Sequence, residues 1–248
     1  FWLEPGENTF GSSPSCAVVL SDQSTPEIAG ILVLGPEGTV AANAEEGSGI
    51  LLNDEPMIEP ALLTADADGR PDVISAGRNR FHIIKRGEKY GARVKDLEAP
   101  TRLSFAGIEH FPIDPSMRVE ARFEKYDAPK EVSIPTVLNQ DTTMKSFGLL
   151  HFSLGDEDLT LEPFMGSADS ESMFLIFRDG TSGVTTYGAG RYMSVEAADK
   201  EGKTVIDFNY AYNPPCAFTP YATCPLPPPQ NVMFVPIEAG EKYSGEAH

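Results

Sequence analysis

The sequence predicts an all-β protein, and three observations support this assignment. Short apolar runs alternate with turn signals such as GPEG, DADG and DGTSG along the chain. The 22 glycines and 21 prolines are spread throughout, and long helical periodicity is scarce. Many short strands at short spacing are typical of a β-sandwich or a barrel. We therefore expect an N-terminal β-sandwich packed on a C-terminal antiparallel β-sheet or half-barrel.

Strand-like runs include residues 17–20, 28–34, 73–74, 81–84, 119–123, 149–154, 173–177, 185–195, 204–210 and 232–237. The only helical segments that the pattern suggests are short, for example around residues 61–65. The stretch 213–231 holds seven prolines, which cannot donate ladder hydrogen bonds, so we expect an extended wrapping segment there. A boundary near residues 95–100 predicts two domains, 1–97 and 98–248.

The charge of the chain excludes several classes of partner. Among 248 residues, 37 Asp and Glu stand against 19 Lys and Arg, which gives a formal net charge of -18. Such a charge repels phosphate, so no nucleic-acid partner and no docking on anionic membranes are expected. No window approaches the length of apolar sequence that a transmembrane helix needs. The chain begins at Phe1 inside a segment that reads as structured, which indicates a processed product or a fragment.

The first half carries a family resemblance. The stretches GENTFGSSPSCAVVLSDQSTPEIAGILVL and GSGILLNDEPM resemble the forkhead-associated fold, a β-sandwich whose typical members bind phosphothreonine. Ser12 stands where that family has its phosphate-binding Arg, residues 25–30 contain no His, and Asn53 is followed by Asp rather than Gly. Residues 1–63 contain no Lys or Arg, whereas phosphate recognition needs cations. The resemblance therefore implies the fold without a phosphothreonine site, and a phosphopeptide ligand is disfavoured.

In the second half, polar side chains are predicted to gather on one face of a sheet. Hairpin turns centred near positions 181 and 199 would pair strands 173–178, 185–195 and 204–210. Because side chains alternate faces along a strand, Arg191 would face Asp207 or Asn209 across the ladder. Glycines 188 and 190 would let another backbone or a ligand approach the opposite face.

An Arg, a carboxylate, an amide and a phenol on an apolar sheet are typical of the floor of a ligand pocket. The predicted ligand-binding residues are Tyr187, Arg191, Asp207, Asn209, Asn213 and Cys216. The ligand would be a small anionic molecule with a carboxylate for Arg191. Two alternatives stay open. One is a hydrolase that uses Asp207 as general base. The other is a structural scaffold without a ligand, in which a buried Arg–Asp pair ties the strands to the Pro-rich segment.

The remaining chemistry-bearing residues give weaker signals. Cys216 and Cys224 lie eight positions apart, and both a disulfide and two free thiols are consistent with this spacing. No paired histidines accompany them, so neither a metal site nor a cofactor is expected, and no catalytic residue is assigned. One basic run, IIKRGEKYGARVKD, carries Lys85, Arg86, Lys89, Arg93 and Lys95. It could receive an anionic ligand or pack against the acidic surface of the first half, and the local abundance of carboxylates favours packing.

Five strings together closely resemble the domain of unknown function family 1684. They are FWLEPGENTFGS, IIKRGEKYGARVKD, FPIDPSMRVEARF, RDGTSGVTTYGAGRY and DFNYAYNPPCAFTPYATCPLPPPQN. The resemblance extends over nearly the entire chain, and the last two strings are the most specific. The family is mostly bacterial and implies no activity. Some members look exported, so a periplasmic, secreted or cytoplasmic location stays open.

Overall fold

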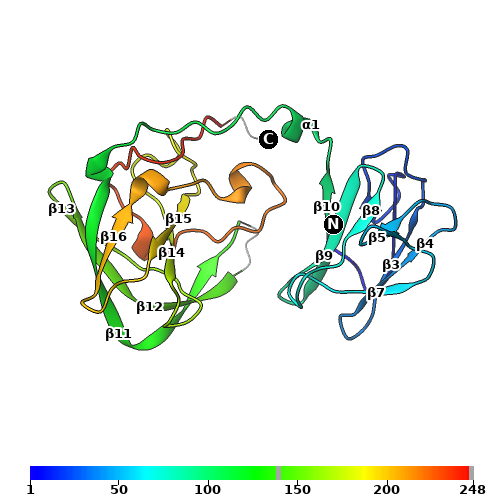
Figure 1. Cartoon of the computed structure of the whole chain (residues 1–248), viewed down its shortest axis with the longest axis horizontal. Coiled ribbons are helices and arrows are strands. Elements are labelled where there is room, and N and C mark those ends of the chain that lie inside the picture. Colours follow the sequence, from blue (N-terminus) through cyan, green and yellow to red (C-terminus); the bar gives the residue numbers. More distant parts are fainter. Residues whose placement is uncertain (138–140, 246–248) are drawn as a thin grey trace. The chain divides into compact units, whose positions relative to one another are not determined.

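The computed structural model describes residues 1–137 and 141–245, and the chain divides into two compact units, Phe1–Phe105 and Ala106–His248. The described part of the chain contains sixteen strands, one four-residue α-helix and four short 3₁₀ helices, so the prediction of an all-β fold is confirmed (Figure 1). No helix in these residues is long and apolar enough to cross a membrane. Each unit is described by itself below.

Unit 1 consists of two five-stranded sheets around one core. The first sheet has the order β2-β1-β3-β4-β7, with β1 Gly6–Gly11, β2 Val18–Val19, β3 Gly30–Leu34, β4 Val40–Ala44 and β7 Ala61–Leu63. The second has the order β10-β9-β8-β5-β6, with β5 Leu51–Leu52, β6 Glu55–Pro56, β8 Ile74–Ala76, β9 Asn79–Arg86 and β10 Lys89–Asp96. Phe10 of the first sheet meets Phe81 of the second edge to face, with ring centroids 5.4 Å apart. The apolar faces of both sheets therefore share a single core, as in a sandwich. Unit 1 also holds helix α1, Pro100–Leu103.

The helix suggested around residues 61–65 is wrong. Ala61–Leu63 forms the edge strand β7, and Val40 of β4 pairs with Leu63. A run of five residues is too short to form a stable helix by itself, because helix nucleation is costly. Residues 61–63 instead form hydrogen bonds with the neighbouring strand β4.

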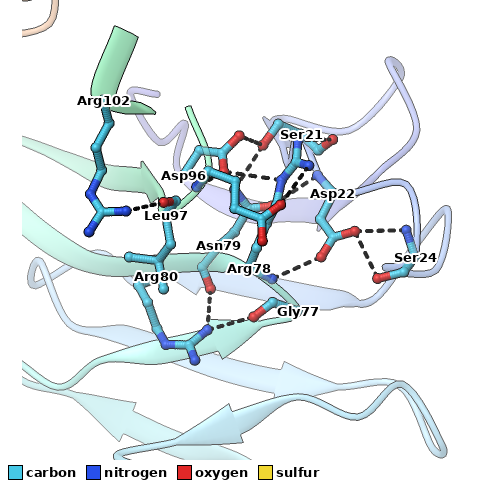
Figure 2. A network of polar contacts seen from close by, with 11 residues as sticks. Ser21, Asp22, Ser24, Gly77, Arg78, Asn79, Arg80, Asp96, Leu97 and Arg102 are labelled. Carbon is cyan, nitrogen blue, oxygen red and sulfur yellow. Dashed lines mark hydrogen bonds and ion pairs between the residues drawn. The ribbon is translucent and has the colours of Figure 1, made fainter. Parts of the chain in front are cut away.

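A polar network joins the 21–24 loop of unit 1 to the 77–80 turn and to the end of β10 (Figure 2). The carboxylate of Asp22 accepts hydrogen bonds from the backbone N–H of Arg78 at 2.8 Å and from both the N–H and the hydroxyl of Ser24. These donors lower the pKa of Asp22 to about 2, the Arg78 N–H contributing most. The Arg78 side chain lies 3.1 Å from Asp96, so the network fixes three chain segments against one another.

Unit 2 is built on a four-stranded antiparallel sheet in the order β13-β12-β11-β16. Its strands are β11 Arg118–Pro135, β12 Asp141–Leu154, β13 Glu157–Leu161 and β16 Lys203–Asp207. The two longest strands, β11 and β12, pair along a hairpin drawn in green in Figure 1, with a register shift between Lys125 and Lys130. One face of this sheet is apolar and packs in the core of the unit through Ala121, Leu150, Phe152 and Ile206. The 3₁₀ helix η1, Pro115–Met117, precedes β11.

A separate hairpin, β14 (Ser172–Phe177) with β15 (Arg191–Glu196), packs on that core. Phe177 pairs with Arg191, so the ladder centres on position 184, the mean of 177 and 191, rather than on 181. The strand predicted to begin at position 185 is therefore too long. Residues 181–186 instead form a compact turn, in which Thr181 O accepts the N–H groups of Val184 and Thr186. The paired positions sum to 368 in the structure and to 362 in the prediction, an even difference, so residues of β14 and β15 that were predicted to share a face, such as Phe177 and Arg191, still do.

The last two predicted strands also differ from the structure. Strand β16 ends at Asp207 because its carboxylate caps the 3₁₀ helix η2, Phe208–Tyr210. Residues 232–237 form no strand, although a bridge between Arg178 and Val232 and hydrogen bonds of Met233 and Val235 link them to the chain after β14. In the described residues after Tyr210, the regular elements are the 3₁₀ helices η3, Pro215–Ala217, and η4, Pro229–Asn231. The Pro-rich stretch thus supplies no strand, as predicted.

Gly190 allows the Pro-rich segment to pack closely against the chain just before β15. Its φ is +96°, and a Cβ there would lie 2.5 Å from Phe177 O and 2.6 Å from Cγ of Pro227. The predicted close approach at this glycine is made by the chain itself.

Candidate functional site

Arg191, the centre of the predicted cluster, is sealed in the core of unit 2. Its side chain has no solvent exposure and lies 2.9 Å from the equally buried carboxylate of Asp179. The guanidinium also donates to the carbonyls of Ile237, at 2.9 Å, and Ala239. The ring of Phe177 lies on one side, 5.4 Å from the guanidinium carbon. Arg191 therefore ties β15 to the C-terminal segment and offers no surface to a ligand.

Asp179 is held in place by donors other than Arg191. One carboxylate oxygen accepts from the N–H and the hydroxyl of Thr181, at 2.8 Å and 2.5 Å, and from the N–H of Ile237 at 3.2 Å. Thr181 in turn shares a hydrogen bond with Thr186. The arrangement matches the structural alternative, a buried Arg–Asp pair that satisfies the carbonyls of a long irregular segment, with Asp179 in place of Asp207.

The predicted pairing of Arg191 with Asp207 or Asn209 is wrong. Strand β16 pairs with β11, where Asp207 lies opposite Arg118, and it does not pair with β15. The buried side chains of β16 and its continuation are Ile206 and Phe208, so Asp207 and Asn209 point to the other face. After the turn at 197–202, β16 pairs with β11 instead of β15. Asp207 and Asn209 therefore lie on the opposite face from the predicted one.

Asp207 and Asn209 form a local structural contact of their own. Asn209 donates from its side-chain amide to Asp207 at 2.8 Å and to Asp114 O at 2.9 Å. The carboxylate of Asp207 also lies 3.9 Å from the Arg118 guanidinium. These bonds fix the segment before β11 against η2, and Asp207 lies at the end of β16 in the four-stranded sheet, whereas Arg191 lies in the β14–β15 hairpin.

Tyr187, Asn213 and Cys216 lie together around the Pro-rich segment. The Tyr187 hydroxyl donates to Cys216 O at 3.1 Å, and burial raises its pKa. The Asn213 side chain donates to Lys242 O at 2.9 Å. The backbone N–H of Cys216 lies 3.2 Å from Sγ of Cys224, and both cysteines are free thiols. A hydrogen bond to Cys224 and burial raise the pKa of the Cys216 thiol, so it is a weak nucleophile.

The opening that the structure does show lies on the polar face of the main sheet of unit 2. We call it the polar groove. It has a volume of about 1050 Å³ and is open to solvent, and its polar lining includes Glu120, Arg122, His151, Asp158, Thr160 and Lys203. In the strand ladders, Arg122 of β11 lies opposite His151 of β12 on one side and opposite Lys203 of β16 on the other, and His151 lies opposite Thr160 of β13. Cross-strand partners share a face, so these four side chains form one row across all four strands.

Contacts within the polar groove organise its charges. Nδ1 of His151 lies 3.3 Å from the Thr160 hydroxyl, and Nε2 lies 3.0 Å from the carboxylate of Glu124, although not in line for a hydrogen bond. Lys203 pairs with Glu201 at 2.8 Å. In the part of the chain that the structure describes, no carboxylate lies within 4 Å of the Arg122 guanidinium, which leaves this cation available for a ligand.

Sequence reasoning missed these residues although one signal was present. The run RVEARFE alternates strictly, with Val119, Ala121 and Phe123 separated by charged residues, and this pattern predicts a strand with a charged face. The partners of that face could not be read from the sequence, because His151 and Lys203 come from strands far along the chain.

The described residues contain no group of three or more His, Cys, Asp or Glu that could hold a metal ion. The acids of the polar groove are separated along and across the strands, and several are engaged locally. Asp158, for example, accepts from the Ser153 hydroxyl at 2.7 Å.

Comparisons with known proteins place unit 2 in a family. A family model described as "Protein of unknown function (DUF1684)" matches residues 103–242. The resemblance expected over nearly the entire chain is thus shown for its second part, and the strings FWLEPGENTFGS and IIKRGEKYGARVKD lie outside the match. No curated protein matches the chain.

One solved structure resembles part of the chain. It is the solution NMR structure of an uncharacterized protein from gene locus rrnAC0354 of Haloarcula marismortui, with 34% sequence identity and a TM-score of 0.50. The similarity covers 58% of this chain and 80% of that one. Its description gives no activity, so it supports the family and the fold.

Proposed function

Since the chain belongs to the DUF1684 family of proteins of unknown function, we propose its function from geometry: unit 2 binds a small ligand in the polar groove. The observation that carries this proposal is the position of Arg122. It lies in the centre of an open groove of about 1050 Å³, between His151 and Lys203. A cation without a carboxylate partner on a concave polar surface is suited to an anionic group of a ligand.

The polar groove also favours a particular ligand class. Glu120 and Asp158 line it beside the cations, so a purely anionic molecule would be repelled at its edges. A small molecule with one carboxylate for Arg122, and with hydroxyl or amino donors for the flanking carboxylates, satisfies both sets of groups. The ligand remains a small anionic molecule, but the anchoring guanidinium is that of Arg122 rather than Arg191.

A thermal-shift panel of glutamate, glucuronate and other small carboxylates that carry amino or hydroxyl groups tests the proposal. We expect at least one compound to raise the Tm of unit 2, by mass action on the folded state. Arg122→Ala should weaken that compound's affinity by about tenfold or more, the loss expected for one charge-assisted contact. Arg118→Ala is the matched control, because Arg118 lies on the same face of β11 but outside the groove lining. If no compound stabilises the protein, or if both variants bind equally, the proposal fails.

For unit 1 we propose a forkhead-associated-like sandwich without a phosphothreonine site. Its two five-stranded sheets around one core support the architecture. Arg78, a cation in a loop of this unit, is engaged by Asp96 at 3.1 Å and Glu98 at 3.6 Å, which opposes phosphate binding there. Phosphothreonine peptides should therefore leave the Tm of unit 1 unchanged.

A further inference from the structure

The solvent-facing side of the β9–β10 hairpin in unit 1 gathers cations. The ladder pairs Arg80 with Lys95, His82 with Arg93, and Arg86 with Lys89. Cross-strand partners share a face, while the core face carries residues such as Phe81 and Ile83. We call this set the basic stripe: Arg80, His82, Arg86, Lys89, Arg93 and Lys95.

The basic stripe is electrostatically unfavourable for the isolated fold. Like charges directly opposite one another in a sheet are destabilising, and two of the three pairs join Arg to Lys. Burial lowers the pKa of His82, and the charges of Lys95, Arg93 and Arg86 lower it further. Arg86 is neutralised by Asp66, with bonds of 3.0 Å and 2.8 Å, which agrees in part with the predicted packing against acidic residues of the first half.

Two lysines of the basic stripe are left for another molecule. Lys89 and Lys95 are exposed, and neither has a carboxylate within 4 Å among the residues that the structure describes. The protein has a net charge of -18, so a face that carries several cations differs in sign from the chain as a whole and would attract an acidic molecule.

An aromatic side chain lies in the middle of the basic stripe. The segment of Phe1 to Leu3 adds to the free edge of β10, with Ala92 N–H donating to Phe1 O at 2.8 Å and Leu3 N–H donating to Tyr90 O at 2.9 Å. Trp2 thereby pairs with Gly91, and a Cβ at Gly91 would lie 3.0 Å from its indole ring. The indole thus lies on the stripe face beside Gly91, which stands between Lys89 and Arg93 along β10, and Trp2 is 40% exposed to solvent.

We propose that the basic stripe is the docking surface for an acidic polypeptide segment of a partner protein, bound in extended conformation with an apolar side chain against Trp2. On the stripe face of β10, Arg93 and Lys95 stand two positions apart, about 7 Å, and Lys89 stands four positions before Arg93, with Gly91 and the indole of Trp2 between them. An extended chain with acidic residues at alternate positions presents its carboxylates with the same repeat on one side. The match of repeat and of charge sign carries the proposal.

A polypeptide fits this surface better than a nucleic acid does. A long phosphate polymer would extend beyond the stripe, over a chain that carries 37 Asp and Glu. A short acidic segment can be confined to the stripe, within about one Debye length of its cations and away from the surrounding carboxylates.

Trp2 provides a direct readout, because it is the only tryptophan of the chain. The probe is an acetylated peptide about eight residues long with glutamate at alternate positions and one central leucine. We expect a saturable change in Trp2 emission when the peptide is added at low salt. The affinity should fall about tenfold or more when the salt concentration is raised toward 0.2 M, because surface ion pairs are screened. A peptide with glutamine in place of glutamate should give no change.

The double variant Lys89→Gln/Lys95→Gln should weaken binding of the glutamate peptide by about tenfold or more, because two charge-assisted contacts are lost. Arg70→Gln, an exposed cation of unit 1 outside the stripe, is the control and should bind normally. Unchanged Tm values establish that the variants are folded.

Three results would overturn the proposal. The first is no fluorescence response, or an equal response from the glutamine peptide. The second is a single-stranded oligonucleotide or tripolyphosphate that binds as tightly as the peptide and is equally sensitive to the double variant. The third is low-salt self-association of the protein that the double variant abolishes, which would assign the stripe to a second copy. None of these results bears on the polar groove of unit 2.

Discussion

The guanidinium of Arg191 and the carboxylate of Asp179 lie 2.9 Å apart, and neither side chain is exposed to solvent. Arg191 comes from β15, Asp179 follows β14, and both contact the chain at Ile237. The start of β15, the turn after β14 and the C-terminal segment at Ile237 are thereby held together by side-chain hydrogen bonds rather than by strand pairing. A buried pair of this kind contributes to the arrangement of the fold more than to net stability.

Breaking this pair should be costly. Arg191→Met leaves the Asp179 carboxylate buried without its cation, and we expect the free energy of unfolding to fall by about 3–5 kcal/mol. Urea unfolding followed by far-UV circular dichroism measures it. The double variant Arg191→Met/Asp179→Leu should lose less than the single one, because no uncompensated charge remains. Arg178→Met, at an exposed neighbouring position, should have little effect.

Asn231 makes a second buried link between separate parts of unit 2. Its amide donates to Glu162 O and Ile176 O, each at 2.9 Å, and its carbonyl oxygen accepts the Glu162 N–H at 2.7 Å. Asn231→Ala leaves these backbone groups without partners, and we expect a loss of about 2–4 kcal/mol in urea unfolding. The exposed neighbour Gln230 provides the matched control, and an equal loss in Gln230→Ala would contradict the explanation.

Thiol titration decides between the two states that the spacing of Cys216 and Cys224 allowed. In the structure both are thiols, and the raised pKa of Cys216 keeps it protonated at pH 8. Without reductant, Ellman's reagent should therefore detect three thiols in denaturant and react slowly with the native protein, since all three cysteines are buried. A count of one thiol in denaturant would instead establish a disulfide.

Asp22 predicts a pH dependence in unit 1. Its pKa is lowered to about 2 from an ordinary value of 3.8. A depressed carboxyl pKa contributes stability that is complete above the unfolded value and is lost as the pH falls through the folded value. The stability difference between wild type and Asp22→Asn should thus be largest above about pH 4 and shrink toward pH 2. Urea unfolding followed by Trp2 emission measures it, with Glu59→Gln, a substitution at an exposed carboxylate of the same unit, as the control.

The sequence determined which residues share a face within single strands. Alternation correctly placed Met173, Leu175 and Phe177 on one face, and all three are buried together. The absence of ladder donors likewise identified the Pro-rich segment as irregular. Both features depend on the local backbone, where the period of two is fixed by covalent geometry.

The tertiary structure alone decided how those strands are paired. Asp207 went to the other face because β16 left β15 and paired with β11. Asp179 became the partner of Arg191 because the 179–190 turn folds compactly instead of extending the ladder. The row of Arg122, His151 and Lys203 exists only after three strands, separated by tens of residues, are brought into register. Strand pairing is set by burial of the whole apolar face and by turn geometry, neither of which a single strand contains.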